Sequence, residues 1–401
     1  MTWGMFHGLG AEAPYPDGDR LACVEAGCLP GLPQPGHRQC ANVRTRPRSV
    51  LRCLVVGLFP ALLLAACGAE TTTTSPGQLP TQPGPFGVGV QQVTFTKKSA
   101  THPTQDRLLL TDIWYPTAPD ASPEDGDLGG VVNAPWATSA THLPLLLFSH
   151  GGCSLPTLSR FFMRALASWG FIVAAPLHIG DLMTEPRCGI DDSDGYANRP
   201  FDIRFVITSL LQLNTDPTSF FSGAIDPHRI GMSGNSNGGN TTVLVSESDP
   251  RVIAGLVLTG SLVGPVSKIH IPMMVQVGAL DSVCPFDRCE RPLHLSLNPP
   301  KYLVEMLHTG HTAFVDDGCW SNCCGPTAMA CTVCDSDKSM PFCDAAGPDA
   351  LTADAAHQFI LRYAVPFLLH WVAGDNRFDA FLAPDAAPPG VIFTADTGGS
   401  S

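Results

Sequence analysis

Short, almost wholly apolar runs alternate with longer amphipathic stretches along most of this chain. The runs at 143–148, 171–175 and 273–277 are bounded by turn residues, which is typical of strands buried on both faces of a sheet. Between them, 200–213 carries apolar residues at helical spacing and is predicted to be a helix. The alternation predicts an α/β architecture with a mostly parallel central sheet and helices on both faces.

The same criteria place the remaining elements. Strands are expected at 90–96, 107–115, 143–148, 171–175, 229–233, 252–259, 273–277 and 302–307. Helices are expected at 161–169, 200–213 and 359–372. One domain over 87–401 accommodates all of them, with a cysteine-rich insertion at 315–347.

A different pattern precedes this domain: basic residues, an apolar run and then small residues. The basic residues are Arg44, Arg46, Arg48 and Arg52, and the apolar run 53–64 leads into Leu64-Ala65-Ala66-Cys67-Gly68. This order is that of a signal peptide, and a cysteine directly after the cleavage site resembles the lipobox of bacterial lipoproteins, whose thiol is lipidated. We expect 1–66 to be a leader and Cys67 the lipidation site. The protein would then be an exported, membrane-anchored lipoprotein of the periplasm, outer membrane or cell surface.

Three features refine this interpretation of the N-terminal region. The alternative, a membrane-spanning helix over 53–67, is disfavoured because the run contains Pro60 and is shorter than the ~20 residues that a span requires. Residues 1–42 fit neither interpretation and suggest an overcalled start or a long leader. Residues 67–86 are rich in Thr, Pro and Gly, which predicts a flexible tether.

Composition and charge restrict the partners. The formal net charge is −13, which argues against binding to a phosphate backbone, so no nucleic-acid partner is expected. The chain has 15 cysteines, more than a reducing cytosol favours unless they bind metal, so an oxidising compartment is indicated. We expect a monomer that acts on a small-molecule or lipid substrate.

The sharpest local motif is Gly234-Asn235-Ser236-Asn237-Gly238, which follows an apolar strand and precedes a predicted helix. A G-x-S-x-G motif in this context places a serine on a strained strand-to-helix turn, where its Oγ is exposed as a nucleophile. The alternative is a glycine-rich loop without catalytic function. Two further groups of residues favour the catalytic interpretation.

The first group is His150-Gly151-Gly152, directly after the strand at 143–148. Glycines there would let the loop approach a substrate carbonyl, and the backbone N–H groups of Gly152 and Asn237 would form an oxyanion hole. The alternative is an ordinary turn between a strand and a helix. His150 is expected to be a structural hydrogen-bond partner rather than a base.

The second group supplies the acid and the base of a triad, in the order Ser, Asp, His. Asp281 follows the strand at 273–277, and His311 follows the strand at 302–307. His311 would remove the proton of Ser236, while Asp281 would orient and stabilise the imidazole. His308 and Asp287 are the rivals for these two roles.

With these residues in order, the chain resembles α/β-hydrolases, in particular platelet-activating factor acetylhydrolases and dienelactone-hydrolase-like proteins, from about Gly87 to Leu382. The similar stretches beyond the triad are Asp112-Ile113-Trp114-Tyr115-Pro116, Leu145-Leu146-Leu147-Phe148-Ser149-His150-Gly151, Arg199-Pro200-Phe201-Asp202-Ile203 and Ile225-Asp226-Pro227-His228-Arg229-Ile230-Gly231. The resemblance implies a serine esterase that forms an acyl-enzyme and uses neither metal nor cofactor. Asn235 and the cysteine-rich insertion depart from the family pattern and leave substrate choice open.

The insertion holds Cys319, Cys323, Cys324, Cys331, Cys334 and Cys343. Its Cys-x-x-Cys could belong to a zinc site, but in an exported protein disulfides are favoured. The adjacent Cys323 and Cys324 should not pair with each other, so at least one is expected to reach outside the insertion. The partners available there are Cys153, Cys188, Cys284 and Cys289.

The functional expectation is hydrolysis of carboxylic esters, with phospholipid or short-chain acyl esters as the substrates. The alternatives are a secreted polyester or polymer esterase, and a catalytically silent binding protein with a hydrolase fold.

Overall fold

The computed structural model describes residues 77–119, 128–185, 193–316 and 350–399. The predicted leader, Cys67, Cys188 and all the cysteines of the insertion lie outside these residues. Among the described residues, no helix is both long and apolar enough to cross a bilayer.

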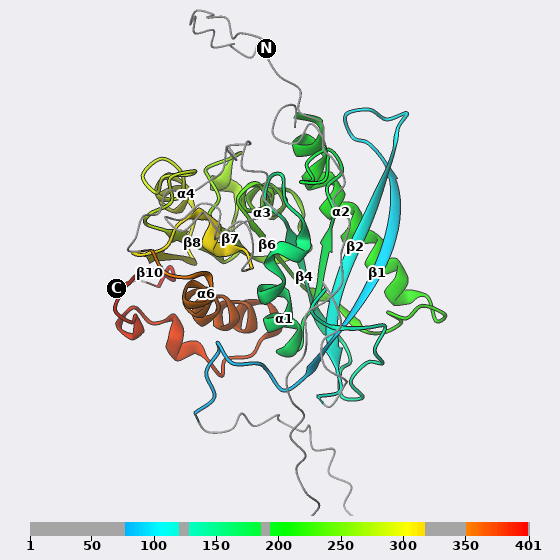
Figure 1. Ribbon diagram of the computed structural model, residues 1–401, viewed down its shortest axis with the longest axis horizontal. Coiled ribbons are helices and arrows are strands. Elements are labelled where there is room, and N and C mark those ends of the chain that lie inside the picture. Colours follow the sequence, from blue (N-terminus) through cyan, green and yellow to red (C-terminus); the bar gives the residue numbers. More distant parts are fainter. Residues whose placement is uncertain (1–76, 120–127, 186–192, 317–349, 400–401) are drawn as a thin grey trace, which may run out of the picture. The chain divides into compact units, whose positions relative to one another are not determined.

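A mixed sheet forms the centre of the domain (Figure 1). Its strands are β1 (Gly87–Lys98), β2 (Asp106–Thr117), β3 (Val131–Val132), β4 (Leu143–Ser149), β5 (Ile172–Pro176), β6 (Ile225–Asn235), β7 (Val252–Leu258), β8 (Met273–Gly278), β9 (Lys301–Met306) and β10 (Val391–Asp396). The order across the sheet is β10-β9-β8-β7-β6-β4-β5-β2-β1-β3. The six central strands from β9 to β5 are mutually parallel. Strand β10 pairs antiparallel with β9, β2 pairs antiparallel with β5 and β1, and β3 pairs parallel with β1.

Helices cover both faces of the sheet, as the sequence pattern predicts. They are α1 (Arg160–Ser168), α2 (Ser193–Thr215), α3 (Asn237–Ser248), α4 (Glu290–Ser296) and α6 (Ala353–Leu368). The β4 residues Leu146 and Phe148 pack with α1 and α6, while Leu145 and Leu147 pack with α2. Alternate residues of one fully buried strand thus serve two cores, which explains why the run is apolar throughout.

The predicted strands all exist, but several boundaries and elements differ. The helix predicted at 200–213 begins earlier, at Ser193, and Pro200 lies inside it. The closing helix begins at Ala353, where the Thr352 side chain accepts a hydrogen bond from the Ala355 amide. Strands β3 and β10 and helix α4 were not predicted. Residues 82–86, expected within the tether, are hydrogen-bonded to the end of α1 through the amides of Gly84 and Phe86.

The parallel strands bring the chemically interesting loops to one edge of the sheet. The loops after β4, β6, β8 and β9 carry Gly152, Ser236, Asp281 and His311. In open α/β sheets, the carboxyl ends of the strands are where ligands bind. This edge is therefore the candidate functional site.

Candidate active site

Ser236 lies at the sharp turn between β6 and α3, with a φ of 55° and a ψ of −118°. A positive φ is unusual for any residue other than glycine, and such strain concentrates at functional sites. The Ser236 amide donates a hydrogen bond to the carbonyl of Leu258 on the neighbouring strand, with 2.8 Å between N and O. The turn is thereby anchored to β7 in this strained conformation.

Glycines flank the turn because backbone atoms occupy the space of a side chain. A Cβ on Gly234 would collide with the carbonyl of Gly238, and a Cβ on Gly238 would collide with the carbonyl of Ser149. The G-x-S-x-G spacing is thus required by close packing of β4, β6 and α3. This is the local geometry that places a serine Oγ above the sheet in nucleophile elbows.

Asp281 and His311 are hydrogen-bonded to each other. The Oδ2 atom of Asp281 lies 2.6 Å from Nδ1 of His311, and both side chains are buried. The loops that carry them run close together: the Leu280 amide donates to the Thr309 carbonyl, and a Cβ on Gly278 would collide with that same carbonyl. The structure therefore brings the predicted acid and base together.

The two rivals lie elsewhere. His308 is exposed in the turn after β9 and is absent from the cleft that His311 lines. The side chain of Asp287 is 79% exposed and forms an ion pair with Arg291 on the outside of α4. Neither residue occupies the position that the chemistry requires.

A cleft at the carboxyl edge of the sheet brings the candidate residues together. It is lined by Gly151, Gly152, Ser154, Leu158, Asn235, Ser236, Asn237, His311, Thr312 and Val315. The predicted nucleophile, the predicted base and both predicted oxyanion residues thus face one cavity.

The two predicted oxyanion amides have suitable surroundings. Asn237 is the first residue of α3, and the first N–H groups of a helix have no partner within it and favour negative charge. Within the described part of the chain, no hydrogen bond uses the amide of Gly152. A Cβ on Gly152 would lie 2.5 Å from Nδ2 of Asn237, so the Asn237 side chain would have to move to make room for it.

His150 is a structural histidine, as expected. Its Nε2 accepts a hydrogen bond from the His178 amide at 3.1 Å, and its Nδ1 lies 2.7 Å from the Gly151 carbonyl. Burial, together with the nearby Arg199 charge, holds the pKa of His150 well below its ordinary value. A neutral ring with Nδ1 protonated satisfies both contacts.

Sequence reasoning missed one titratable group beside Asp281. Glu290, the first residue of α4, is fully buried, and neither of its carboxylate oxygens bonds to another described residue. Burial, with a smaller contribution from the Asp281 charge, raises the pKa of Glu290 to about 9. The side chain is therefore uncharged at neutral pH, and the buried position of a charged residue type gave no signal in the sequence.

The disulfides differ in part from expectation. Cys284 and Cys289, which are five residues apart after Asp281, are bonded to each other. Neither is therefore available to bridge to the insertion. Cys153 is also disulfide-bonded, and its partner lies outside the described residues. The remaining pairings, and the choice between disulfides and zinc in the insertion, lie outside them as well.

The hydrogen-bonded polar side chains at the site include one carboxylate–imidazole pair. Among the residues that the structure describes, no group of three or more His, Cys, Asp or Glu side chains is arranged to hold a metal ion. The Asp281–His311 pair is instead the arrangement that orients an imidazole for proton transfer.

Comparisons with known proteins address the fold. No protein-family model and no curated protein sequence matches the chain. Among solved structures, it is similar to the ferulic acid esterase from Streptomyces cinnamoneus, with a TM-score of 0.61 and 21% sequence identity. The likeness covers 77% of this chain and 96% of that one. Together with the mostly parallel sheet, it shows that the chain has the α/β-hydrolase fold.

Proposed function

We propose that the protein is a serine hydrolase that cleaves carboxylic esters through an acyl-enzyme on Ser236. The observation that carries the proposal is the 2.6 Å hydrogen bond between Asp281 and His311 at a cleft that Ser236 also lines. Nucleophile, base and orienting carboxylate come from three loops at one sheet edge, in the arrangement that serine hydrolases share on unrelated folds.

Each residue has a defined role in the proposed reaction. His311 removes the Ser236 proton as Oγ attacks the ester carbonyl carbon, and Asp281 stabilises the resulting imidazolium. The N–H groups of Gly152 and Asn237 donate hydrogen bonds to the oxyanion of the tetrahedral intermediate. Collapse of this intermediate expels the alcohol, which takes its proton from His311. Water, deprotonated by His311, then attacks the acyl group and releases the acid and free Ser236.

We further propose that the substrate is a short-chain acyl ester or a phospholipid acyl ester. Two features support this class: the resemblance to platelet-activating factor acetylhydrolases and the sequence of the predicted lipobox. A secreted polyester esterase is the second candidate, since the cleft opens to solvent. The likeness to a ferulic acid esterase adds aromatic acyl esters to the substrates worth testing.

A substrate panel tests the proposal. The chain from Cys67 onward, with and without Ser236→Ala, is incubated with aryl esters of increasing acyl length, a phospholipid with a short second acyl chain, a feruloyl ester and polyester film. We expect turnover of the short aryl and phospholipid esters that Ser236→Ala abolishes. Turnover confined to the film would favour the polyester alternative, and no turnover of any ester would indicate a silent binding protein.

The membrane anchor is a separate proposal and needs its own test. We propose that Cys67 is linked to diacylglycerol through a thioether. A cysteine directly after a signal-peptide cleavage site is the residue that carries this modification in bacterial lipoproteins. Cys67→Ser should release the protein from the membrane fraction and from the detergent phase, whereas Cys53→Ser, within the apolar run, should not. Unchanged partitioning of the Cys67→Ser variant would contradict the anchor.

A further inference from the structure

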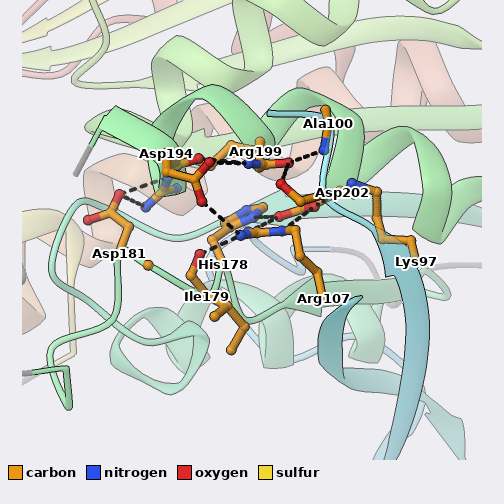
Figure 2. Close-up of polar contacts among 12 residues, drawn as sticks. Lys97, Ala100, Arg107, His178, Ile179, Asp181, Asp194, Arg199 and Asp202 are labelled. Atoms are coloured by element: carbon orange, nitrogen blue, oxygen red, sulfur yellow. Dashed lines mark hydrogen bonds and ion pairs between the residues drawn. The ribbon is translucent and has the colours of Figure 1, made fainter. Parts of the chain in front are cut away.

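A buried arginine lies beneath the loop that carries Gly152. Arg199, on α2, is fully buried, and Figure 2 shows its guanidinium within a network of charged side chains. Its Nη1 donates to the carbonyl of His150 at 2.6 Å, and its Nη2 donates to the carbonyl of Gly151 at 2.9 Å. One planar side chain thus binds two consecutive carbonyls of the predicted oxyanion loop.

Asp181 holds both the arginine and the far side of the same loop. Its Oδ2 accepts hydrogen bonds from Nε and Nη2 of Arg199, at 2.9 and 2.5 Å. Its Oδ1 accepts a hydrogen bond from the backbone amide of Cys153 at 2.9 Å. The Arg199–Asp181 pair therefore fixes the backbone immediately before and immediately after Gly152.

The contacts of Arg199 and Asp181 with this loop, which we call the clamp, also set the direction of the Gly152 N–H, the predicted oxyanion donor. The Gly151 carbonyl and the Gly152 N–H belong to one planar trans peptide, so they point in opposite directions. Because the carbonyl is directed at the buried guanidinium, the N–H of Gly152 is directed away from it, toward the cleft that Gly152 lines. Two adjacent glycines have wide conformational freedom, so without Arg199 and Asp181 only Nδ1 of His150, 2.7 Å from the Gly151 carbonyl, would hold this peptide among the described residues.

A second set of charged residues, Lys97, Arg107 and Asp202, completes the network, and none of the three is hydrogen-bonded to residues 150–153. Asp202, also on α2, accepts hydrogen bonds from Arg107 and Lys97 and lies 3.3 Å from Nδ1 of His178. Arg107 also donates to the carbonyl of Ile179 at 2.9 Å. The network alternates positive and negative groups, as buried charges require. Arg107 is nearly as buried as Arg199 and therefore serves as a matched control.

We propose that Arg199, held by Asp181, is a positioning residue that orients the Gly151–Gly152 peptide so that the Gly152 N–H faces the developing oxyanion. The inference rests on the proposed esterase function and assigns Arg199 a role in it. A donor aimed at the oxyanion acts mainly in the transition state, where the charge develops. Loss of the clamp should therefore lower kcat and leave KM nearly unchanged.

The test compares the same conservative change at two buried arginines. Arg199→Lys keeps the charge but cannot reach two carbonyls and a carboxylate in one plane. We expect its kcat on a short aryl ester to fall about 10²-fold, the effect of losing one oxyanion donor, with KM changed by less than about threefold. Arg107→Lys should lower the Tm but keep kcat within about threefold of wild type.

Asp181→Asn provides a second variant, which decides the matter if Arg199→Lys does not fold. An amide has only one acceptor oxygen, so it cannot accept from both Arg199 and the Cys153 amide. We expect its kcat to fall by about tenfold or more at nearly constant KM. Wild-type kcat in a folded Arg199→Lys or Asp181→Asn variant, or equal losses in Arg199→Lys and Arg107→Lys, would overturn the inference. An inactive wild-type protein would instead overturn the proposed function.

Discussion

The Nδ1 atom of His311 lies 2.6 Å from Oδ2 of Asp281, although 30 residues separate the two in the chain. Because a carboxylate only accepts hydrogen bonds, this contact places the proton of the neutral ring on Nδ1 and leaves Nε2 as its basic atom. Asp281 is itself fixed, since its Oδ1 accepts a hydrogen bond from the Cys284 amide at 2.7 Å. The pair therefore has the orientation and tautomer that a general base requires.

The two histidines of the loop after β9 should differ sharply in their effect on activity. His311→Ala should reduce kcat by about 10³-fold or more, as expected for a triad member. His308→Ala changes an exposed side chain outside the cleft, so it should keep activity within about threefold. Steady-state kinetics on an aryl ester decide, and the reverse pattern would assign the base to His308.

The disulfide beside Asp281 should support both stability and activity. The bond between Cys284 and Cys289 closes a short loop directly after the proposed catalytic carboxylate, and the amide that holds Asp281 belongs to Cys284. Loop-closure entropy gives about 2 kcal/mol for a ring of this size. The double variant Cys284→Ser/Cys289→Ser should therefore unfold at a lower Tm and have a lower kcat. A Tm and kcat equal to those of wild type would show that the bridge is dispensable.

Glu290 should make the protein less stable as the pH rises. Its pKa is raised to about 9 in the folded state, whereas the unfolded chain ionises this group near its ordinary value of 4.5. Its contribution to stability is therefore complete below about pH 4.5 and is lost progressively as the pH rises toward 9, by about 1.4 kcal/mol per pH unit.

Glu290→Gln removes this dependence while keeping the shape of the neutral side chain. Denaturant titrations should show the variant nearly as stable as wild type at pH 4.5 and clearly more stable at pH 8. The partly exposed Glu247→Gln serves as the control and should show no such gain. If Glu290→Gln has no advantage at pH 8, the buried carboxyl does not carry the proton assigned to it.

His178 should make the protein less stable as the pH falls. Burial, with a smaller effect of the Arg199 charge, lowers the pKa of His178 from 6.5 to about 4, and the Asp202 carboxylate 3.3 Å from Nδ1 offsets only part of this effect. The unfolded chain takes up a proton at higher pH than the folded chain does. This contribution to stability is therefore present above about pH 6.5 and is lost as the pH falls toward 4.

The acid effect can be isolated with one variant and one control. His178→Asn should flatten the loss of stability between pH 6.5 and 4, as measured by Tm across this range. The exposed His142→Asn should reproduce the wild-type slope. Equal slopes for wild type and His178→Asn would show that His178 does not control the acid response.

Sequence patterns predicted the central strands and the residues of the candidate site because both depend on local signals. The strand at 143–148 is apolar throughout since its two faces serve two cores, and the glycines at 234 and 238 are required by backbone contacts. The order Ser236, Asp281, His311 along the chain then followed from where parallel strands end.

What the sequence did not reveal depends on contacts between distant segments. Arg199 and Asp202 belong to a motif that the sequence shows. Their contacts form only when the loops that follow β4 and β5 both pack against α2. Pro200 suggested a helix start, yet the preceding Asn198 and Arg199 are buried by tertiary contacts that extend the helix N-terminally. Strand β10, whose residues Val391 and Phe393 alternate with exposed ones, carried a period-two signal that could have been recognised.

Covalent labelling tests the central claim most directly. A fluorophosphonate probe should react with one equivalent of the protein and abolish ester hydrolysis in proportion to labelling, because only a serine with an activated Oγ attacks such a phosphorus centre. Peptide mapping should place the adduct on Ser236, and a folded Ser236→Ala variant should be neither labelled nor active. An adduct on another residue, or more than a tenth of wild-type activity in Ser236→Ala, would contradict the account.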